Sequence, residues 1–360
     1  MLIAAGALTA FLAVATILPF FPFAHGIVRV GDFPRQQFLA AAVIVVILSL
    51  VFGAAGPAWH TIQIVLVLVA AVQAWFIVRF TPIWRKQSAD YDPAADTGET
   101  LRLLASNVKM SNERFEELAA EIERRDPDIF VLMEVDKRWR DALSTVLSAY
   151  PTVIDQSQEN SYGMILGSKF ELSDTVVECL LTDGVPSIIT TVTTPEGQQF
   201  RLYSIHPEPP VPHRGTEGRD GETALVALRV KDETLPVMVT GDLNDVAWSS
   251  TTDRFRRISG LLDPRIGRRI FSTFDARFPL MRWPLDHLFH SAEFRLKDML
   301  RLPACGSDHF PVLFDLVLCR TEDAESKPEE ADGEDIERAR DLVKQADERT
   351  EEAIGTDWEK

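Results

Sequence analysis

The chain has 360 residues, of which 46% are hydrophobic, and it carries a formal net charge of −17. Residues 321–360 hold 16 acidic and 6 basic side chains, so this tail alone accounts for −10 of that charge. An acidic protein is a poor electrostatic match for duplex DNA, because binding to DNA depends largely on neutralising its phosphates. This weighs against a dedicated nuclease without excluding one. Three scattered cysteines exclude a disulfide framework.

The N-terminal part of the chain is apolar enough to cross a membrane three times. The apolar runs lie at residues 2–23, 36–56 and 60–80, and residues 36–78 contain no Asp, Glu, Lys or Arg. One spanning helix needs roughly 20 apolar residues. The alternative for the first run is a cleaved signal peptide, but this run lacks a basic start and is long for such a segment. Residues 1–83 are therefore predicted to form a membrane domain of three transmembrane helices.

The basic residues that flank these runs predict the orientation of the chain. Lys and Arg in short flanks favour the cytoplasmic side of a membrane, and the connection between the second and third runs carries neither. We therefore expect an integral membrane protein, of a bacterial inner membrane, with a cytoplasmic soluble domain. With three spans, one face of the membrane holds Arg29, Arg35, Arg79, Arg85 and Lys86.

Residues 84–99 are predicted to be a polar linker, and residues 100–319 a single soluble domain. Many strand-like runs with few helical ones predict two mixed sheets with helices packed outside, which is an α/β sandwich. Helical periodicity appears at 112–125, and further helices are expected at 137–148, 223–230 and 249–259. Strands are expected at 101–105, 129–133, 164–166, 176–181, 188–192, 200–205, 237–240, 285–289 and 312–318.

The acidic tail, residues 320–360, has two interpretations. Its composition is typical of a solvated, partly disordered segment. A thin apolar stripe between Glu334 and Ile354 would instead allow a helix that docks on a protein partner.

Carboxylate and amide side chains recur where the predicted strands end. Asn107 follows the first strand, Glu134 the second, and Asp242 and Asn244 follow the strand at 237–240. A carboxylate that closes a buried strand is costly unless it is paired or coordinated. Oxygen ligands of this kind suit Mg²⁺, whereas zinc would need His or Cys clusters that are missing here. The alternatives are a surface Glu at a strand end and an ordinary Asp-Leu-Asn-Asp turn.

Two histidines and two further aspartates extend this set. Asp308-His309 precedes the last predicted strand, and Asp286 lies in a short strand where it could orient a histidine. His309 is the best acid–base candidate, because histidine titrates near neutrality. His206 ends another strand and precedes a Pro-rich loop; a satisfied loop histidine is the alternative at this position.

Together, and in this order, the strings resemble the endonuclease/exonuclease/phosphatase superfamily, over about residues 100–318. The match is specific at Gly241-Asp242-Leu243-Asn244 and at Ser307-Asp308-His309. The resemblance implies a four-layer α/β sandwich of the DNase I-like type behind the three transmembrane helices, as in a membrane-anchored bacterial-type member. The roles it implies are catalytic for Asp242, Asn244, His309, Asp286 and His206, metal-binding for Glu134, Asn107 and Asp308, and substrate-binding for Tyr162, Asn244 and His206.

The resemblance further implies hydrolysis of a phosphodiester or phosphomonoester by in-line attack of water, with Mg²⁺ or Mn²⁺ as the cofactor. The expected partners are membrane lipids and a phosphoester substrate, either a lipid headgroup or a nucleic acid. Arg214 and Arg219 could contact an anionic headgroup, although loop arginines are more often solvated. The alternative functions are a membrane-anchored nuclease and a catalytically idle module that binds phosphorylated ligands.

Overall fold

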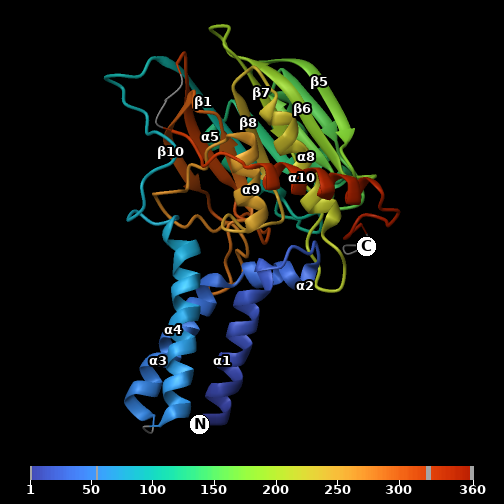
Figure 1. The fold of residues 1–360 in the computed structure, drawn as a ribbon. Helices are drawn as coiled ribbons and strands as arrows, with labels where there is room; N and C mark the ends of the chain where they lie inside the picture. The colour runs from blue at the N-terminus through green and yellow to red at the C-terminus, as the bar shows by residue number, and fades with distance from the viewer. Residues whose placement is uncertain (1, 54–55, 322–325, 357–360) are drawn as a thin grey trace.

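The computed structural model describes residues 2–53, 56–321 and 326–356. It has two parts, a bundle of long apolar helices and an α/β domain that sits on one end of the bundle (Figure 1).

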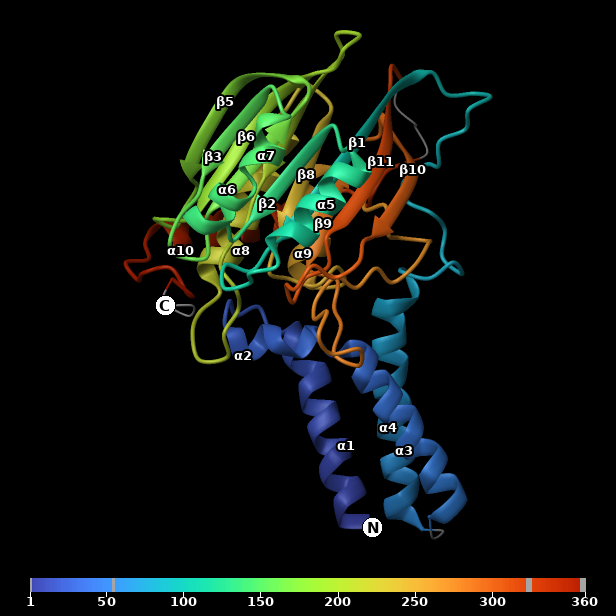
Figure 2. The same cartoon turned by 180° about the vertical axis from the view of Figure 1, so that it is seen from behind.

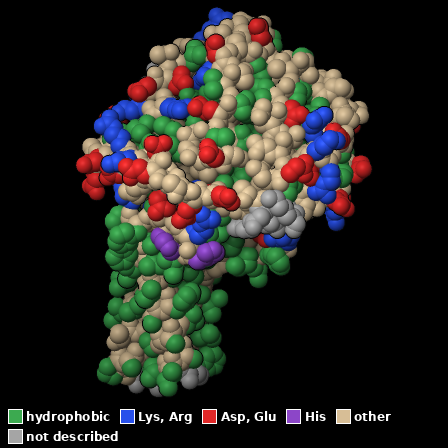
Figure 3. Space-filling view, turned by 90° about the vertical axis from the view of Figure 1, so that its right-hand side faces the viewer, with side chains coloured by type: hydrophobic (Ala, Val, Ile, Leu, Met, Phe, Trp, Pro, Cys, Tyr) green, Lys and Arg blue, Asp and Glu red, His purple; other side chains and the backbone are tan. Residues whose placement is uncertain are grey.

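Three helices of the bundle are long and apolar enough to cross a membrane. They are α1 (Leu2–Ile17), which continues through η1 (Leu18–Phe20), α3 (Arg35–Phe52) and α4 (Pro57–Val78). Hydrophobic side chains cover the visible face of the stalk, and charged side chains gather on the α/β domain (Figure 3). The N-terminus lies at the far end of the bundle, so α1 and α4 run towards the α/β domain (Figure 1). The short helices α2 (Gly26–Arg29) and η2 (Val30–Asp32) connect α1 to α3 beneath that domain.

The α/β domain contains two mixed sheets. Their strand orders are β10-β11-β1-β2-β4-β3 and β5-β6-β7-β8-β9. The pairs β1–β2 and β7–β8 are parallel, and the other pairs are antiparallel. The strands are β1 (Gly98–Asn107), β2 (Ile129–Met133), β3 (Thr152–Gln156), β4 (Met164–Ser168), β5 (Glu171–Cys179), β6 (Pro186–Thr193), β7 (Gln199–Ser204), β8 (Val237–Asp242), β9 (Asp286–His290), β10 (Phe294–Arg301) and β11 (Val312–Cys319).

The sheets pack face to face with helices on both outer sides, which confirms the predicted four-layer sandwich (Figure 2). In β1, Leu103 and Ala105 enter the core between the sheets, whereas Leu104 packs outward against the first helix layer. This alternation follows from the two-residue period of a strand. The first layer is α5 (Phe115–Arg125), α6 (Lys137–Ala142) and α7 (Ser144–Ser148), and the second is α8 (Glu217–Lys231), α9 (Ser250–Ser259) and α10 (Gly333–Asp347).

The structure differs from the sequence prediction at sheet edges and in the tail. The strands β3 and β10 were not predicted, and both are edge strands of the six-stranded sheet. An edge strand has one neighbour and tolerates polar residues, so its hydrophobic pattern is weak. In the tail, residues 333–347 are not a solvated segment. They form the helix α10, which packs against α8 and α9 and buries Ala339, Leu342 and Ala346.

A buried ion pair fastens the membrane connection to the α/β domain. The Nε atom of Arg29 in α2 lies 3.2 Å from Oδ2 of Asp220 in α8, and both side chains are buried. Arg219 forms an ion pair with the same carboxylate at 2.7 Å. The prediction that Arg219 could contact a headgroup is therefore wrong, because Arg219 lies in α8 and its side chain is buried. Arg214 is partly exposed and pairs with Glu351 of the tail at 2.6 Å.

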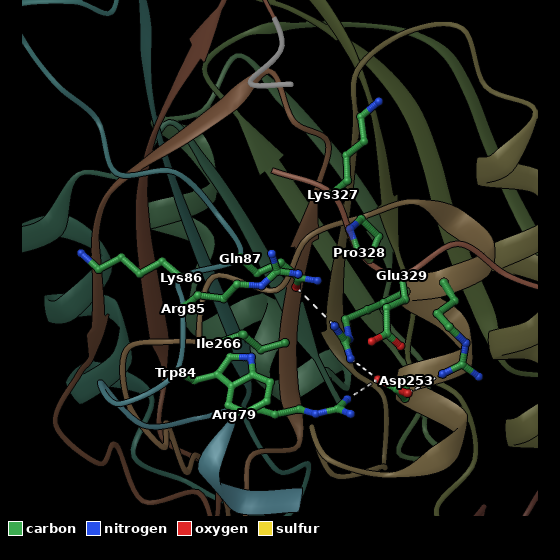
Figure 4. A pocket seen from close by; sticks show the side chains of 12 residues that line it. Arg79, Trp84, Arg85, Lys86, Gln87, Asp253, Ile266, Lys327, Pro328 and Glu329 are labelled. Atoms are coloured by element: carbon green, nitrogen blue, oxygen red, sulfur yellow. Dashed lines mark hydrogen bonds and ion pairs between the residues drawn. The ribbon is translucent and has the colours of Figure 1, made fainter. Parts of the chain in front are cut away.

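The end of α4 is joined to α9 by a second set of polar contacts (Figure 4). Arg79 lies 3.3 Å from Asp253, which also pairs with Arg256. Arg256 in turn donates to Gln87 at 3.3 Å. Two of the three apolar helices therefore lead directly into contacts with the second helix layer, and the two parts of the structure are held in one arrangement.

Replacing Asp220 with alanine tests the first of these joints. The substitution leaves Arg29 and Arg219 buried without their shared carboxylate, which should cost about 3–5 kcal/mol of unfolding free energy. Denaturant unfolding of the full chain in detergent micelles measures the loss. The control is Asp141→Ala, in the exposed Lys137–Asp141 pair, which should leave the midpoint where it is. Equal midpoints for the two variants would contradict the buried-pair interpretation.

Candidate active site

Three strand ends bring the predicted carboxylate and amide side chains together. Asn107 ends β1, Glu134 follows β2, and these strands are parallel neighbours whose carboxyl ends meet. Asp242 ends β8 in the opposing sheet. The Nδ2 atom of Asn107 donates to Glu134 Oε1 at 2.7 Å and to Asp242 Oδ2 at 3.1 Å. One amide group therefore bridges two carboxylates from different sheets.

The backbone at these strand ends adopts conformations that aim the side chains at one point. Glu134 and Asn244 have φ values of 61° and 50°, in the left-handed region that non-glycine residues rarely adopt. Such residues cost of order 1–3 kcal/mol and cluster at functional sites. Gly241 has φ 144°, and a Cβ there would lie 1.9 Å from the carbonyl oxygen of Ile205. Glycine is therefore required by a neighbouring backbone.

His309 lies between two aspartates. Its Nδ1 is 2.9 Å from Asp286 Oδ2, and its Nε2 is 3.4 Å from Asp242 Oδ2. The ring packs against Phe274, with 4.8 Å between the ring centroids. Burial alone would lower the pKa of His309, but the carboxylates of Asp286 and Asp242 outweigh it and raise the pKa to about 10. The imidazolium form is therefore favoured, and it can donate from both ring nitrogens.

Burial lowers the pKa of a histidine but raises the pKa of a carboxylate, as it does for Glu134 and Asp242. It raises the pKa of Glu134 to about 7 and the pKa of Asp242 to about 6, against the favourable charge of His309. Asp286 keeps a lowered pKa despite its burial, because His309 stabilises its charge. The carboxylates are thus gathered where little water can stabilise their negative charge. A cation bound there would interact with them strongly.

The donor set fits a divalent metal ion. Asp242, Asp286 and His309 each offer a ligand atom, and these atoms lie within 4.8 Å of one another. Among the described residues, the buried Oδ1 of Asp286 has no hydrogen-bond partner. Because His309 carries a proton on each nitrogen below its raised pKa, the oxygens are the better ligands. Glu134, Asp242 and Asn107 offer such oxygens, and the ion identity is not fixed by them.

The structure places Asp308 differently from the other predicted metal ligands. Its Oδ2 is 2.9 Å from Lys109 Nζ and 3.3 Å from Arg277 Nη2. Lys109 and Arg277 were not predicted as site residues. Lys109 could have been found, because it follows Asn107 by two residues, whereas Arg277 lies in a loop that carries no sequence signal.

His206, Asn244 and Tyr162 line the same cavity as the carboxylates. His206 Nε2 is 3.9 Å from Asp242 Oδ2, and burial, with the charge of His309, lowers the pKa of His206 to about 3. It is therefore neutral. The amide of Asn244 donates to the carbonyl of Pro207 at 2.9 Å. The Tyr162 hydroxyl donates to the carbonyl of Ile354, so its phenol is held by the tail.

The cavity has a volume of about 530 Å³, with a polar floor and mostly apolar walls. Glu134, Asp242 and His309 lie on the floor. The walls come from segments far apart in the sequence: Val30, Phe33 and Pro34 from the membrane connection, Phe274, Met281, Trp283 and Leu285 from the segment before β9, Pro209 and Pro210 from the loop after His206, and Ile354 and Gly355 from the tail.

The tail is fixed at the cavity by a buried carboxylate. Arg349 Nη1 lies 2.7 Å from Glu208 Oε2, and the amide of Ile354 donates to Glu208 Oε1 at 2.7 Å. The last described residues therefore form one wall of the site.

The family model described as the Endonuclease/Exonuclease/phosphatase family matches residues 104–309, more than half of the chain. The chain belongs to the endonuclease/exonuclease/phosphatase family. The matched segment begins at the β1 core and ends at His309, so it contains all the strand ends described above. The chain is therefore a phosphoric ester hydrolase of this divalent-metal-dependent family.

Solved structures agree with the fold of this family. A family member from Bacteroides thetaiotaomicron is 20% identical, with a TM-score of 0.51, over 62% of this chain and 99% of that one. D. rerio TDP2 complexed with single-strand DNA product is 17% identical, with a TM-score of 0.51, over 61% of this chain and 99% of that one. Both are similar to the α/β domain and confirm the predicted DNase I-like fold. A search of curated proteins finds no match.

The raised carboxylate pKa values predict that metal binding weakens in acid. As the pH falls through about 7 and then about 6, Glu134 and Asp242 take up protons that a metal ion must displace. The affinity for Mn²⁺ should therefore fall by about tenfold per pH unit for each proton displaced. Calorimetric titration of the full chain at several pH values measures this. The control is Glu134→Gln, which should bind more weakly at high pH and lose part of the dependence.

Proposed function

We propose that this protein is a membrane-anchored, divalent-metal-dependent phosphoesterase that hydrolyses its substrate by in-line attack of water. The observation that carries the proposal is the convergence of Glu134, Asn107 and Asp242 from three strand ends, with His309 held between two aspartates. A core of strands does not need this arrangement, and phosphate ester hydrolysis does.

Asp242 orients the attacking water. Its Oδ1 accepts from the backbone amide of Asn244 at 2.9 Å and its Oδ2 from Asn107, so the carboxylate is held from both sides. A fixed carboxylate with a pKa of about 6 can accept a proton near neutral pH. Pre-set geometry at the water removes much of the entropic cost of attack.

His309 donates to a phosphate oxygen. Asp286 orients its ring through Nδ1 and keeps it charged, which leaves Nε2 to face the cavity. An imidazolium in a site with little water stabilises the negative charge that develops on the phosphate. His206, Asn244 and Tyr162 border the same space and are the proposed substrate contacts.

Glu134 and Asn107 would hold Mg²⁺ or Mn²⁺, with Asp308 nearby. When bound, the ion supplies neutralisation of the developing charge. Burial disfavours the charged forms of Glu134 and Asp242, which raises their pKa values. A nearby cation would relieve this unfavourable charge, and that relief favours binding of the ion.

The three apolar helices are the proposed membrane anchor, in a bacterial inner membrane with a cytoplasmic α/β domain. Arg29, Arg35 and Arg79 all lie at the end of the bundle that meets the domain, in agreement with positive residues on the cytoplasmic side.

A membrane-anchored nuclease is the second candidate within the same chemistry. Among the described lining residues of the cavity, Lys109 is the single Lys or Arg, and it is paired with Asp308. Nucleic acids are usually bound through many cationic contacts to phosphates, so the lining disfavours this candidate. A binding module without turnover would have no use for a fixed carboxylate that can accept a proton.

Glu134→Gln should abolish metal-dependent turnover of bis-(p-nitrophenyl) phosphate by the full chain. The same variant, without metal, should unfold at a higher temperature than the parent above pH 7. The pKa of Glu134 is higher in the folded state than the usual 4.5, so the destabilisation by its charge builds up between about pH 4.5 and 7 and is complete above pH 7. Activity and thermal scans with and without chelator test both effects. Retained turnover would remove Glu134 from the site.

His309→Ala should lower the rate by ~10²–10⁴, as expected for loss of an acid–base group. Asp286→Asn should be less severe and should move the alkaline limb of the pH–rate profile to lower pH. The reason is that the Asp286 charge raises the pKa of His309, and a group that must stay protonated is lost earlier when that pKa falls. An unchanged alkaline limb in Asp286→Asn would contradict this role for the pair.

A further inference from the structure

One wall of the catalytic cavity belongs to the membrane domain. Val30, Phe33 and Pro34 line the cavity and lie between α2 and the start of α3, the second apolar span. Phe33 packs edge-on against Trp283 of the facing wall, with 5.9 Å between the ring centroids. The apolar lining therefore continues from the site to the top of the spans without a polar break at this contact.

The facing wall also reaches the level of the membrane. The segment between α9 and β9 descends to the top of the helical bundle (Figure 2). Its loop exposes three large apolar side chains, Phe278, Leu280 and Met281, and Leu280 is 85% exposed. The carbonyl of Leu280 accepts from Gln37 at 2.8 Å, which ties the loop to the first turns of α3. Beside the three candidate spans, such a loop is placed to contact lipid.

More apolar side chains are exposed in the segment that runs from the end of α1 to η2. The exposed ones are Phe20, Phe21, Phe23, Ile27 and Val30. An exposed apolar patch of this kind is a mark of a membrane or ligand contact, and aromatic rings are favoured at the level of lipid headgroups.

The cavity thus changes character from its floor to its entrance. Asp242 and His309 are buried, whereas the apolar lining residue Met281 is 46% exposed, so the cavity opens beside apolar side chains. A ligand that satisfies both regions is an amphiphile, with a phosphoester at one end and hydrocarbon at the other. A free sugar phosphate or a nucleic acid leaves the apolar entrance uncovered.

We propose that the substrate is a membrane lipid with a phosphoester headgroup, which enters the cavity from the bilayer between the η2–α3 connection and the 278–281 loop. This rests on the proposed phosphoesterase function. The lipid keeps its hydrocarbon chains in the bilayer, and its headgroup reaches Asp242 and His309. Water adds to phosphorus, the P–O bond to the leaving group breaks, and the proton of the water passes to that leaving oxygen or to solvent.

The test uses the full chain in nanodiscs with Mn²⁺, and compares three kinds of phosphoester. The first is the lipid of the nanodisc bilayer itself, in separate preparations that contain phosphatidylcholine, phosphatidylglycerol, phosphatidic acid or a phosphatidylinositol phosphate. The second is soluble bis-(p-nitrophenyl) phosphate, and the third is a single-stranded oligonucleotide. Mass spectrometry measures the released headgroup or phosphate. Glu134→Gln and a chelator define the turnover that belongs to the site. We expect site-dependent release from at least one lipid.

The entrance is tested with Leu280→Glu, which adds a charge to the exposed loop outside the cavity lining. The ratio of lipid turnover to soluble-ester turnover should fall by about tenfold, because an exposed apolar side chain proposed to contact lipid is replaced by one that prefers water. Phe278→Glu is the second entrance variant and should act in the same direction. The control is Val176→Glu, an exposed apolar position on β5 away from the bundle, which should leave the ratio as it is.

Each outcome separates the two proposals. Site-dependent hydrolysis of the soluble ester or the oligonucleotide, without release from any lipid of the nanodisc bilayer, overturns the lipid proposal and leaves the phosphoesterase. Lipid turnover with an unchanged ratio in both entrance variants overturns the entry route. The absence of site-dependent turnover on every substrate overturns the proposed function itself.

Discussion

The arrangement of this molecule depends on the carboxylate of Asp220. It is buried in α8 between Arg29 of the membrane connection and its own neighbour Arg219. Arg219 also donates to the carbonyl of Asn244 at 2.9 Å. One carboxylate therefore links the segment that leads into the second span with the strand end that carries Asp242. A buried pair of this kind adds little net stability compared with apolar packing, but it is costly to break and so fixes geometry.

A second constraint is the concentration of negative charge at the strand ends. Glu134 and Asp242 share one amide donor, and burial raises the pKa of both. His309 offsets part of this charge, because Asp286 holds it in the cationic form. The folded state thus keeps a site that is incomplete without a cation. The left-handed backbone at Glu134 adds a further cost, and the surrounding sheets must hold it in place.

Local sequence strings predicted the catalytic floor but not the walls. Asn107, Glu134 and Asp242 were predictable because each follows an apolar run, and parallel strands bring such ends together. Phe33, Trp283 and Ile354 were not, since they meet only after remote segments have packed, and nothing in their neighbourhoods indicates a cavity. The edge strands β3 and β10 were not predicted for a related reason. Each has a neighbouring strand on one side only, so its sequence shows a weaker alternation of apolar and polar residues.

The N-terminal helical part of the chain also contributes to the cavity. A fragment that began near residue 98 would keep the strand ends, but it would lose Phe33 from the cavity and Arg29 from the buried ion pair. Asp220 would then keep its ion pair with Arg219 and its hydrogen bond from Thr216, but lose the pair with Arg29. The entrance would be open to water on the side that now faces the bundle. In physical terms the polar floor of the cavity belongs to the sandwich, whereas part of its apolar wall belongs to the connection between the apolar helices.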